Sequence, residues 1–220
     1  DYLAKNPARK VELPEMRKPC ERFLTEAEII KMLNALSGKN RLIFHCLVTL
    51  ALRPGELFAV RMKDVQPGQI QIDEQTYRNR LKAPKTKSSV APVVLPSKLE
   101  TELLRWISTL KRRNPDDFVF ESRHHHKPID PRRYLRDVLR PKAKELGIEG
   151  FTYQAIRRTF ATQAMEAGAN LKHIQGQMRH AHAQMTDSYT KTIEQGQREA
   201  VERFDRKFFG DPLESNEKIN

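Results

Sequence analysis

The most informative stretch of the sequence reads Gln154-Ala155-Ile156-Arg157-Arg158-Thr159-Phe160-Ala161-Thr162. Within and beyond it, apolar residues recur at helical spacing, at Ile156, Phe160, Ala164 and Ala167. This period predicts an amphipathic helix over residues 152–168 with one face in a core. Arg157 lies about 100° from the apolar stripe, at its edge, where a guanidinium can reach a cleft. Taken alone, such an arginine is more often a solvated charge on a helix face.

Helical periodicity continues on both sides of this stretch. After it, the pattern predicts helices over residues 171–179, 183–190 and 192–208; before it, over 26–37, 40–52, 97–111 and 131–145. Thr25 and Glu28 form a capping-box pattern at the start of the first helix. Pro54 favours an end of the second helix at Arg53 and is well placed to begin a new helix through Leu57 and Val60.

Between residues 68 and 96 the period of the apolar residues changes to two. The segment 69–73 alternates between polar and apolar residues, and the segment 90–95 is rich in β-branched residues, with the polar stretch 85–89 before it. This pattern predicts a small antiparallel sheet of two or three strands. The segment Phe118-Val119-Phe120 favours one more short strand. The expected fold class is therefore mainly α with a small antiparallel β-sheet (α+β).

The chain has 220 residues, which favours one compact domain. Residues 1–24 carry three prolines among many charges and no sustained period, so we expect a linker from a preceding N-terminal domain. We expect residues 25–209 to form the domain itself and residues 210–220 to form a polar C-terminal tail. No internal repeat or low-complexity segment is visible.

The composition is strongly basic. Lys plus Arg number 40 against 28 Asp plus Glu, a formal charge of +12. A polyanionic partner is therefore expected, and a basic RNA-binding or ribosome-associated protein would also explain the charge.

The sequence shows no pattern of a metal site or a disulfide framework. Its two cysteines indicate neither a disulfide framework nor a zinc motif. The adjacent histidines His124, His125 and His126 point in different directions and favour a solvated loop over a metal site. No apolar stretch is long enough to span a bilayer, so we expect a cytoplasmic protein.

Three side chains with chemical potential stand at a distinctive spacing. Arg157, His180 and Tyr189 are 23 and then 9 residues apart, the last two within Met178-Arg179-His180 and Met185-Thr186-Asp187-Ser188-Tyr189-Thr190. Far upstream lies Leu52-Arg53-Pro54-Gly55-Glu56-Leu57. A lone tyrosine of this kind is usually an ordinary half-buried residue, so the joint spacing carries the argument.

With these motifs the chain resembles the tyrosine recombinases, also called the phage integrase family, from about Thr25 to Phe208. The first catalytic arginine of that family lies in Leu-Arg-x-x-Glu-Leu, which matches Arg53, and the second in His-x-x-Arg-x-Thr-Phe-Ala-Thr, which matches from Arg157 onward. A Leu-Gly-His segment and a tyrosine nine residues later correspond to His180 and Tyr189. The lysine of the family's β-hairpin corresponds best to Lys85, with Lys87 as the alternative.

The resemblance implies a role for each of these residues in DNA strand cleavage and rejoining. Arg53 and Arg157 would clamp the non-bridging oxygens of the scissile phosphate, and His180 would add a hydrogen bond. Tyr189 would attack phosphorus and form a 3′-phosphotyrosine link, while Lys85 would protonate the 5′-oxygen that leaves. The bond energy is kept in that link, so no cofactor or metal is implied.

Gln154 departs from the family pattern, which usually has a histidine at this position. Glutamine can donate a hydrogen bond to a phosphate oxygen, but it cannot accept and carry a proton near neutral pH. The departure is consistent with a slower enzyme, with a base supplied by another group, or with a DNA-binding domain that has lost catalysis. An activity of the type IB topoisomerase kind, which relaxes supercoils without strand exchange, is a further alternative.

The resemblance also implies partners: double-stranded DNA, and other copies of the chain in a synaptic tetramer assembled through the last helix, in a protein encoded by bacteria or phage. The apolar stripe of that helix comprises Ile193, Val201, Phe204, Phe208 and Phe209. Whether the stripe packs on its own domain or docks into a neighbouring protomer stays open. Candidate contacts to the DNA backbone are Lys111, Arg112, Arg113, Arg132, Arg133, Arg136 and Arg140.

Overall fold

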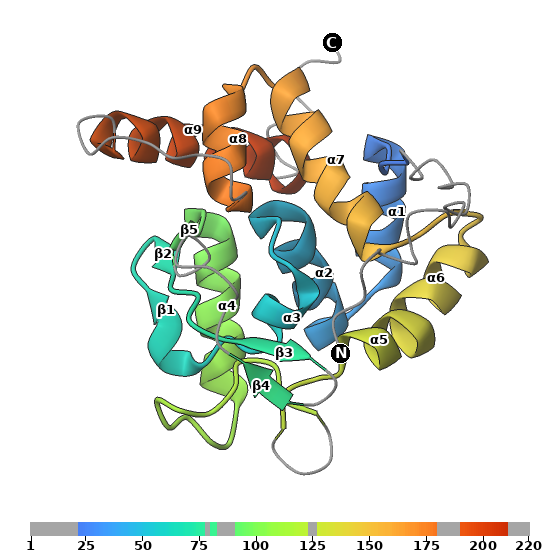
Figure 1. Ribbon diagram of the computed structural model, residues 1–220. Coiled ribbons are helices and arrows are strands. Elements are labelled where there is room, and N and C mark those ends of the chain that lie inside the picture. Colours follow the sequence, from blue (N-terminus) through green and yellow to red (C-terminus); the bar gives the residue numbers. More distant parts are fainter. Residues whose placement is uncertain (1–21, 78–79, 83–90, 123–126, 180–189, 211–220) are drawn as a thin grey trace, which may run out of the picture.

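The computed structural model describes residues 22–77, 80–82, 91–122, 127–179 and 190–210, with side chains described from residue 197 onward in the last of these ranges. Within them the chain is mostly helical, with short antiparallel strands gathered on one side (Figure 1). The α+β class is therefore confirmed. The expected linker lies outside the described residues except for residues 22–24, and the expected tail lies outside them except for Gly210.

Helix α2 (Gly38–Leu50) forms the centre of the fold (Figure 1). Every residue from Leu42 to Leu50 is buried, so this helix is enclosed all round rather than amphipathic. The longer helices that pack against it are α1 (Glu26–Ala35), α4 (Ser97–Thr109), α7 (Tyr153–Glu166) and α9 (Thr190–Phe209). The capping box predicted for α1 is present, because Thr25 and Glu28 exchange hydrogen bonds between side chain and backbone.

The chain turns at the end of α2 into the short helix α3 (Pro54–Leu57), which begins at Pro54 as predicted but ends before Val60, where the prediction had it continue. A 3-10 turn over Met62–Asp64 then leads into a three-stranded antiparallel sheet. Its strands are β1 (Val65–Gln66), β2 (Gln69–Ile70) and β5 (Val93–Val94), in the order β1-β2-β5. The predicted strands at 69–73 and 90–95 exist, and they pair with each other, but both are shorter than expected.

A second antiparallel pair, β3 (Gln75–Tyr77) and β4 (Arg80–Lys82), was not predicted from the sequence. The prediction of a strand at residues 118–120 is wrong. The segment makes one isolated bridge, between Arg61 and Phe118, and Val119 N–H donates to Val60 O at 3.0 Å. Its apolar residues are buried by tertiary packing instead. Pairing cannot extend because the chain next to the bridge coils into the 3-10 turn.

The second half of the described chain is helical, as expected. Over residues 131–145, α5 (Pro131–Tyr134), a π-helical turn (Leu135–Leu139) and α6 (Arg140–Glu145) follow without a break. Pro141 has no N–H to donate one turn back, and the wider π turn lies just before it. Helices α7 and α8 (Leu171–Met178) match the predicted helices, whereas the helix predicted at 183–190 lies outside the described residues except for its last residue.

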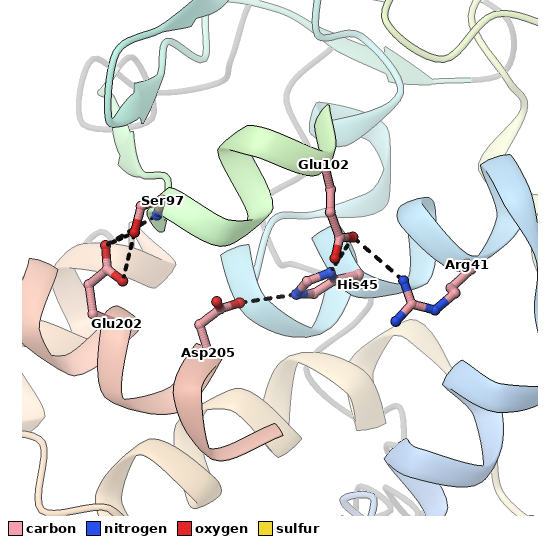
Figure 2. A network of polar contacts seen from close by, with 6 residues as sticks. All are labelled: Arg41, His45, Ser97, Glu102, Glu202 and Asp205. Carbon is pink, nitrogen blue, oxygen red and sulfur yellow. Dashed lines mark hydrogen bonds and ion pairs between the residues drawn. The ribbon is translucent and has the colours of Figure 1, made fainter. Parts of the chain in front are cut away.

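The last helix, α9, packs on its own domain over its described side chains. Val201 and Phe204 are fully buried, and Phe209 stacks on His45 with ring centroids 3.5 Å apart. Figure 2 shows the polar contacts that accompany this packing: His45 of α2 lies between Glu102 of α4 (Nδ1–Oε2, 3.1 Å) and Asp205 of α9 (Nε2–Oδ1, 3.0 Å). The described part of the apolar stripe, from Val201 onward, thus packs within the chain, and docking into a neighbouring protomer stays a prediction.

Candidate active site

Arg53 occupies the N-cap of α3, between the buried residues Leu52 and Leu57. Its backbone N–H donates to Glu56 Oε2 at 2.8 Å, and its side-chain Nη1 donates to Glu56 Oε1 at 3.0 Å. Both oxygens of one buried carboxylate therefore hold this arginine. The Arg53 side chain is 43 % exposed, so its remaining donors can reach a ligand in solution.

Arg157 lies in the middle of α7 and is partly buried, at the edge of the helix face that packs on α2. Its Nη1 donates to Ala51 O at the end of α2, and its Nη2 donates to Met178 O at the end of α8, at 3.2 Å. Burial, with the positive charge of Arg53 as the next cause, lowers the pKa of Arg157 to about 10. It therefore remains charged at neutral pH, close enough to Arg53 for the two charges to repel each other.

The two helix ends that the Arg157 side chain binds have strained backbone. Among the described residues, Ala51 and Arg179 are the non-glycine residues with positive φ, at 49° and 51°. They are the C-caps of α2 and α8, and the carbonyl oxygens that Arg157 binds belong to Ala51 itself and to the residue before Arg179. Strained backbone that persists in a folded protein is concentrated at functional sites.

Arg179 is the member of the cluster that the sequence motifs did not assign. Its side chain is 2 % exposed, and its Nη2 lies 2.6 Å from Oε1 of Glu56, which is 3 % exposed. The same Oε1 atom accepts from Arg53, so one carboxylate joins two guanidiniums. The sequence does carry a sign of this residue: Arg179 directly precedes His180, at the position where the family motif has glycine.

Gln154 is exposed in the first turn of α7, three residues before Arg157. Residues at this spacing are neighbours on a helix surface, so the glutamine and the arginine lie on the same side of α7. The structure brings together Arg53 and Arg157, from segments about a hundred positions apart in the sequence, and Gln154 lies one turn from Arg157 on α7.

The other predicted site residues, Lys85 with its alternative Lys87, His180 and Tyr189, lie outside the described residues. Their neighbours in the sequence are described. Arg179, directly before His180, is in the cluster, and its Nη1 lies 3.5 Å from the carbonyl oxygen of Ala91, six residues after Lys85. Thr190, directly after Tyr189, begins α9.

The described site is strongly cationic. Arg53, Arg157 and Arg179 surround the carboxylate of Glu56, which leaves two positive charges uncompensated within the cluster. Such a cluster suits an oxyanion that can accept several N–H donors, as a phosphate does. The described residues include no group of three or more His, Cys, Asp or Glu side chains that could hold a metal ion. The three adjacent histidines 124–126 lie outside the described residues.

Cations also line the exposed surface next to the cluster. Tyr77 of β3 is 48 % exposed, and Lys82 Nζ and Arg132 Cζ lie 5.6 and 5.7 Å from the centre of its ring. Strand β3 packs against α3, which carries Arg53. The residues predicted to contact the DNA backbone are all exposed: Lys111, Arg112, Arg113, Arg132, Arg133, Arg136 and Arg140.

Within the described ranges no helix is both long and apolar enough to cross a membrane.

Sequence comparisons relate the chain to recombinases. The model of the phage integrase family matches residues 22–195. Tyrosine recombinase XerA of Pyrococcus horikoshii is 27% identical over 197 residues, which cover 89% of this chain and 66% of the relative. Tyrosine recombinase XerD of Listeria innocua is 29% identical over 197 residues, which cover 86% of this chain and 64% of the relative. The chain thus spans about two thirds of the length of these relatives.

Solved structures share the fold. An XerA recombinase is 20% identical with a TM-score of 0.60, covering 84% of this chain and 67% of its own. The integrase from mycobacterium phage Brujita is 18% identical with a TM-score of 0.66, covering 91% and 64%. The integrase of transposon Tn1549, in complex with transposon right end DNA, is 24% identical with a TM-score of 0.67, covering 88% and 72%.

Proposed function

The chain belongs to the phage integrase family of tyrosine recombinases, and from this premise we propose that it cleaves and rejoins DNA at specific sites through a phosphotyrosine link formed by Tyr189. The observation that carries the proposal is the convergence of Arg53 and Arg157 around one buried carboxylate. The two arginines come from motifs about a hundred residues apart; Arg53 is 43 % exposed, so a phosphate oxygen can reach it, and Arg157 stays charged beside it.

The proposed reaction exchanges one phosphoester for another. The oxygen of Tyr189 bonds to phosphorus, the bond from phosphorus to the 5′-oxygen breaks, and Lys85 gives that oxygen its proton. Negative charge grows on the non-bridging oxygens, where Arg53, Arg157 and His180 donate. Reversal with a different 5′-hydroxyl rejoins the strand. The phenol proton needs an acceptor other than Gln154, because an amide does not take up a proton near neutral pH.

Double-stranded DNA is the proposed substrate. The net charge of +12 and the exposed cations beside α3 favour a polyanion, and the Tn1549 integrase with this fold was solved in complex with DNA. The names of the relatives favour strand exchange over relaxation of supercoils and over a domain that only binds DNA. We therefore propose recombination rather than a topoisomerase-type activity or a DNA-binding domain without catalysis.

The test is covalent capture of DNA. The protein is incubated with a pool of duplexes that carry a nick and a randomised centre, and linked DNA is isolated under denaturing conditions and sequenced. We expect an adduct in the wild type, none in Tyr189→Phe, and an unchanged adduct in the matched control Tyr153→Phe, whose hydroxyl donates to Pro131 O. Salt-sensitive DNA binding without any Tyr189-dependent adduct would contradict an active recombinase and favour a DNA-binding module.

We further propose that copies of the chain assemble into a synaptic tetramer on DNA through α9. In the structure α9 packs within its own chain, so exchange requires it to leave the surface formed by α2, α4, α7 and α8. Light scattering on complexes with the captured DNA site measures the assembly. A monomer on each site at all protein concentrations would contradict it.

A further inference from the structure

Arg179 has a costly environment that the mechanism above does not use. Its side chain is almost fully buried, and its backbone has the left-handed conformation that favours glycine. Burial, the largest cause, lowers its pKa, so the fold places a cation where a cation is disfavoured. Nothing in the local sequence demands an arginine there, because glycine would relieve the backbone strain and remove the buried charge.

The contacts of Arg179 are electrostatic rather than those of a well-bonded structural arginine. Nη2 lies 2.6 Å from Glu56 Oε1, in an ion pair that is buried on both sides. Nε has no hydrogen-bond partner among the described residues, and Nη1 reaches Ala91 O at 3.5 Å. The guanidinium therefore acts mainly as a positive charge next to Glu56.

Glu56 explains why a positive charge is needed there. Its carboxylate holds both the backbone and the side chain of Arg53, which fixes that arginine but also neutralises it. A phosphodiester bound by Arg53 would be repelled by the negative charge of Glu56, which contacts the same arginine. A second cation on the same Oε1 atom lets Glu56 keep its orienting bonds while Arg53 keeps its attraction for an anion.

We propose that Arg179 is a positioning residue that neutralises Glu56, so that Arg53 stays both oriented and available to the scissile phosphate. This inference rests on the proposed function and adds a third arginine to its site. Arg179 also follows Met178, whose carbonyl oxygen accepts from Arg157, so the same turn supports both phosphate-binding arginines.

The test compares Arg179→Gly, Arg179→Lys and the double variant Arg179→Gly with Glu56→Gln. Glycine suits the positive φ and so offsets part of the cost of breaking the buried pair with Glu56; the single variant should fold, with a melting temperature below that of the wild type. On the captured DNA site at saturating protein, we expect Arg179→Gly to slow adduct formation about a hundred-fold, the scale of a misplaced catalytic group.

Two rescues separate positioning from a structural role. Arg179→Lys keeps the charge and should retain a rate much closer to that of the wild type. Glu56→Gln in the glycine variant removes the charge that needed neutralising and should recover part of the rate. A wild-type rate in Arg179→Gly, or a loss that follows a fall in melting temperature and is not relieved by Glu56→Gln, would overturn the proposal.

A second measurement is independent of cleavage. Inorganic sulfate should raise the melting temperature of the wild type more than sodium chloride of equal ionic strength, and this rise should shrink in Arg179→Gly and return in the double variant. If the wild type forms no adduct, the proposed function fails and the sulfate comparison alone decides the role of Arg179. If the adduct forms but the sulfate rise is equal in all variants, only the Arg179 proposal fails.

Discussion

Arg157 shows at the scale of one residue how binding and stability oppose each other. Its pKa of about 10 lies below the ordinary value of an arginine, chiefly because of burial and then because of Arg53. The folded state therefore holds this proton less tightly than the unfolded state. The resulting cost to stability is fully present below about pH 10 and is relieved as the pH rises above that value.

An anion bound by Arg157 should offset that cost at neutral pH. At a sulfate concentration about a hundred times its Kd, linkage predicts a gain of about 2.7 kcal/mol, or roughly 5–10 °C in melting temperature for a chain of this size. The gain should decline above pH 10 as Arg157 loses its proton, and it should be smaller in Arg157→Gln. Differential scanning calorimetry measures both. An equal gain in that variant would show that sulfate binds elsewhere.

Gln154 allows a direct test of what the missing histidine contributes. In Gln154→His we expect single-turnover adduct formation to rise about ten- to hundred-fold near pH 8, because imidazole can take up the phenol proton. The rate should then fall as the pH drops through about 6.5, where imidazole becomes protonated. Gln154→Asn, which cannot carry a proton either, is the control. A rate that matches the wild type across this range would mean that proton transfer does not pass through position 154.

At the scale of elements, the short helix α3 depends on the absence of a side chain at Gly55. A Cβ atom there would lie 2.5 Å from Thr76 O in β3. The glycine is therefore explained by close approach, and it lets β3 pack against the helix that carries Arg53.

Gly55→Ala should push β3 away and destabilise the protein by about 1–3 kcal/mol, the usual cost of overpacking. Adduct formation should fall as well, because Arg53 is two residues away. Gly147→Asn is the matched control: Gly147 has a φ of 72°, no atom lies within 4 Å of a Cβ built there, and asparagine tolerates this conformation. Urea denaturation measures both. A Gly55→Ala variant as stable as the control would contradict the close approach.

At the scale of the whole molecule, the buried contacts of His45 join α2, α4 and α9 (Figure 2). The hydrogen bond from His45, the largest cause, lowers the pKa of Glu102 below 4.5. Glu102 therefore contributes stability that is present above pH 4.5 and is lost as the pH falls through its lowered pKa. Acid should accordingly loosen the contact between α2 and α4.

Asp205→Ala removes the partner of His45 on α9, and Glu202→Ala removes an exposed contact of the same helix, to Ser97. We expect the first change to cost about 3–5 kcal/mol, as breaking a buried pair does, and the second less than about 1 kcal/mol. Hydrogen exchange should show faster opening of α9 in Asp205→Ala. Similar costs in both variants would mean that the His45 contact does not hold α9 in place.

The family, the α+β class and most helices were predictable from the sequence. Helical period, the capping box at Thr25 and the proline at position 54 act within a few residues, so local pattern is enough to place α1, α3, α4 and α7. The spaced motifs indicated the phage integrase family, which the family model confirms. Tyr189, His180 and Lys85 remain predictions, because they rest on motif matches outside the described residues.

Which of these segments contact one another depends on the three-dimensional packing. The strand predicted at 118–120 failed because its partner coils away, and the pair β3 and β4 has too little alternation to be visible in the sequence. The sequence left two placements for the apolar stripe of α9, and only the tertiary structure shows Val201 and Phe204 buried within the chain. The contact between Glu56 and Arg179 joins residues more than a hundred positions apart. Such contacts depend on how helices pack around α2, which no local pattern encodes.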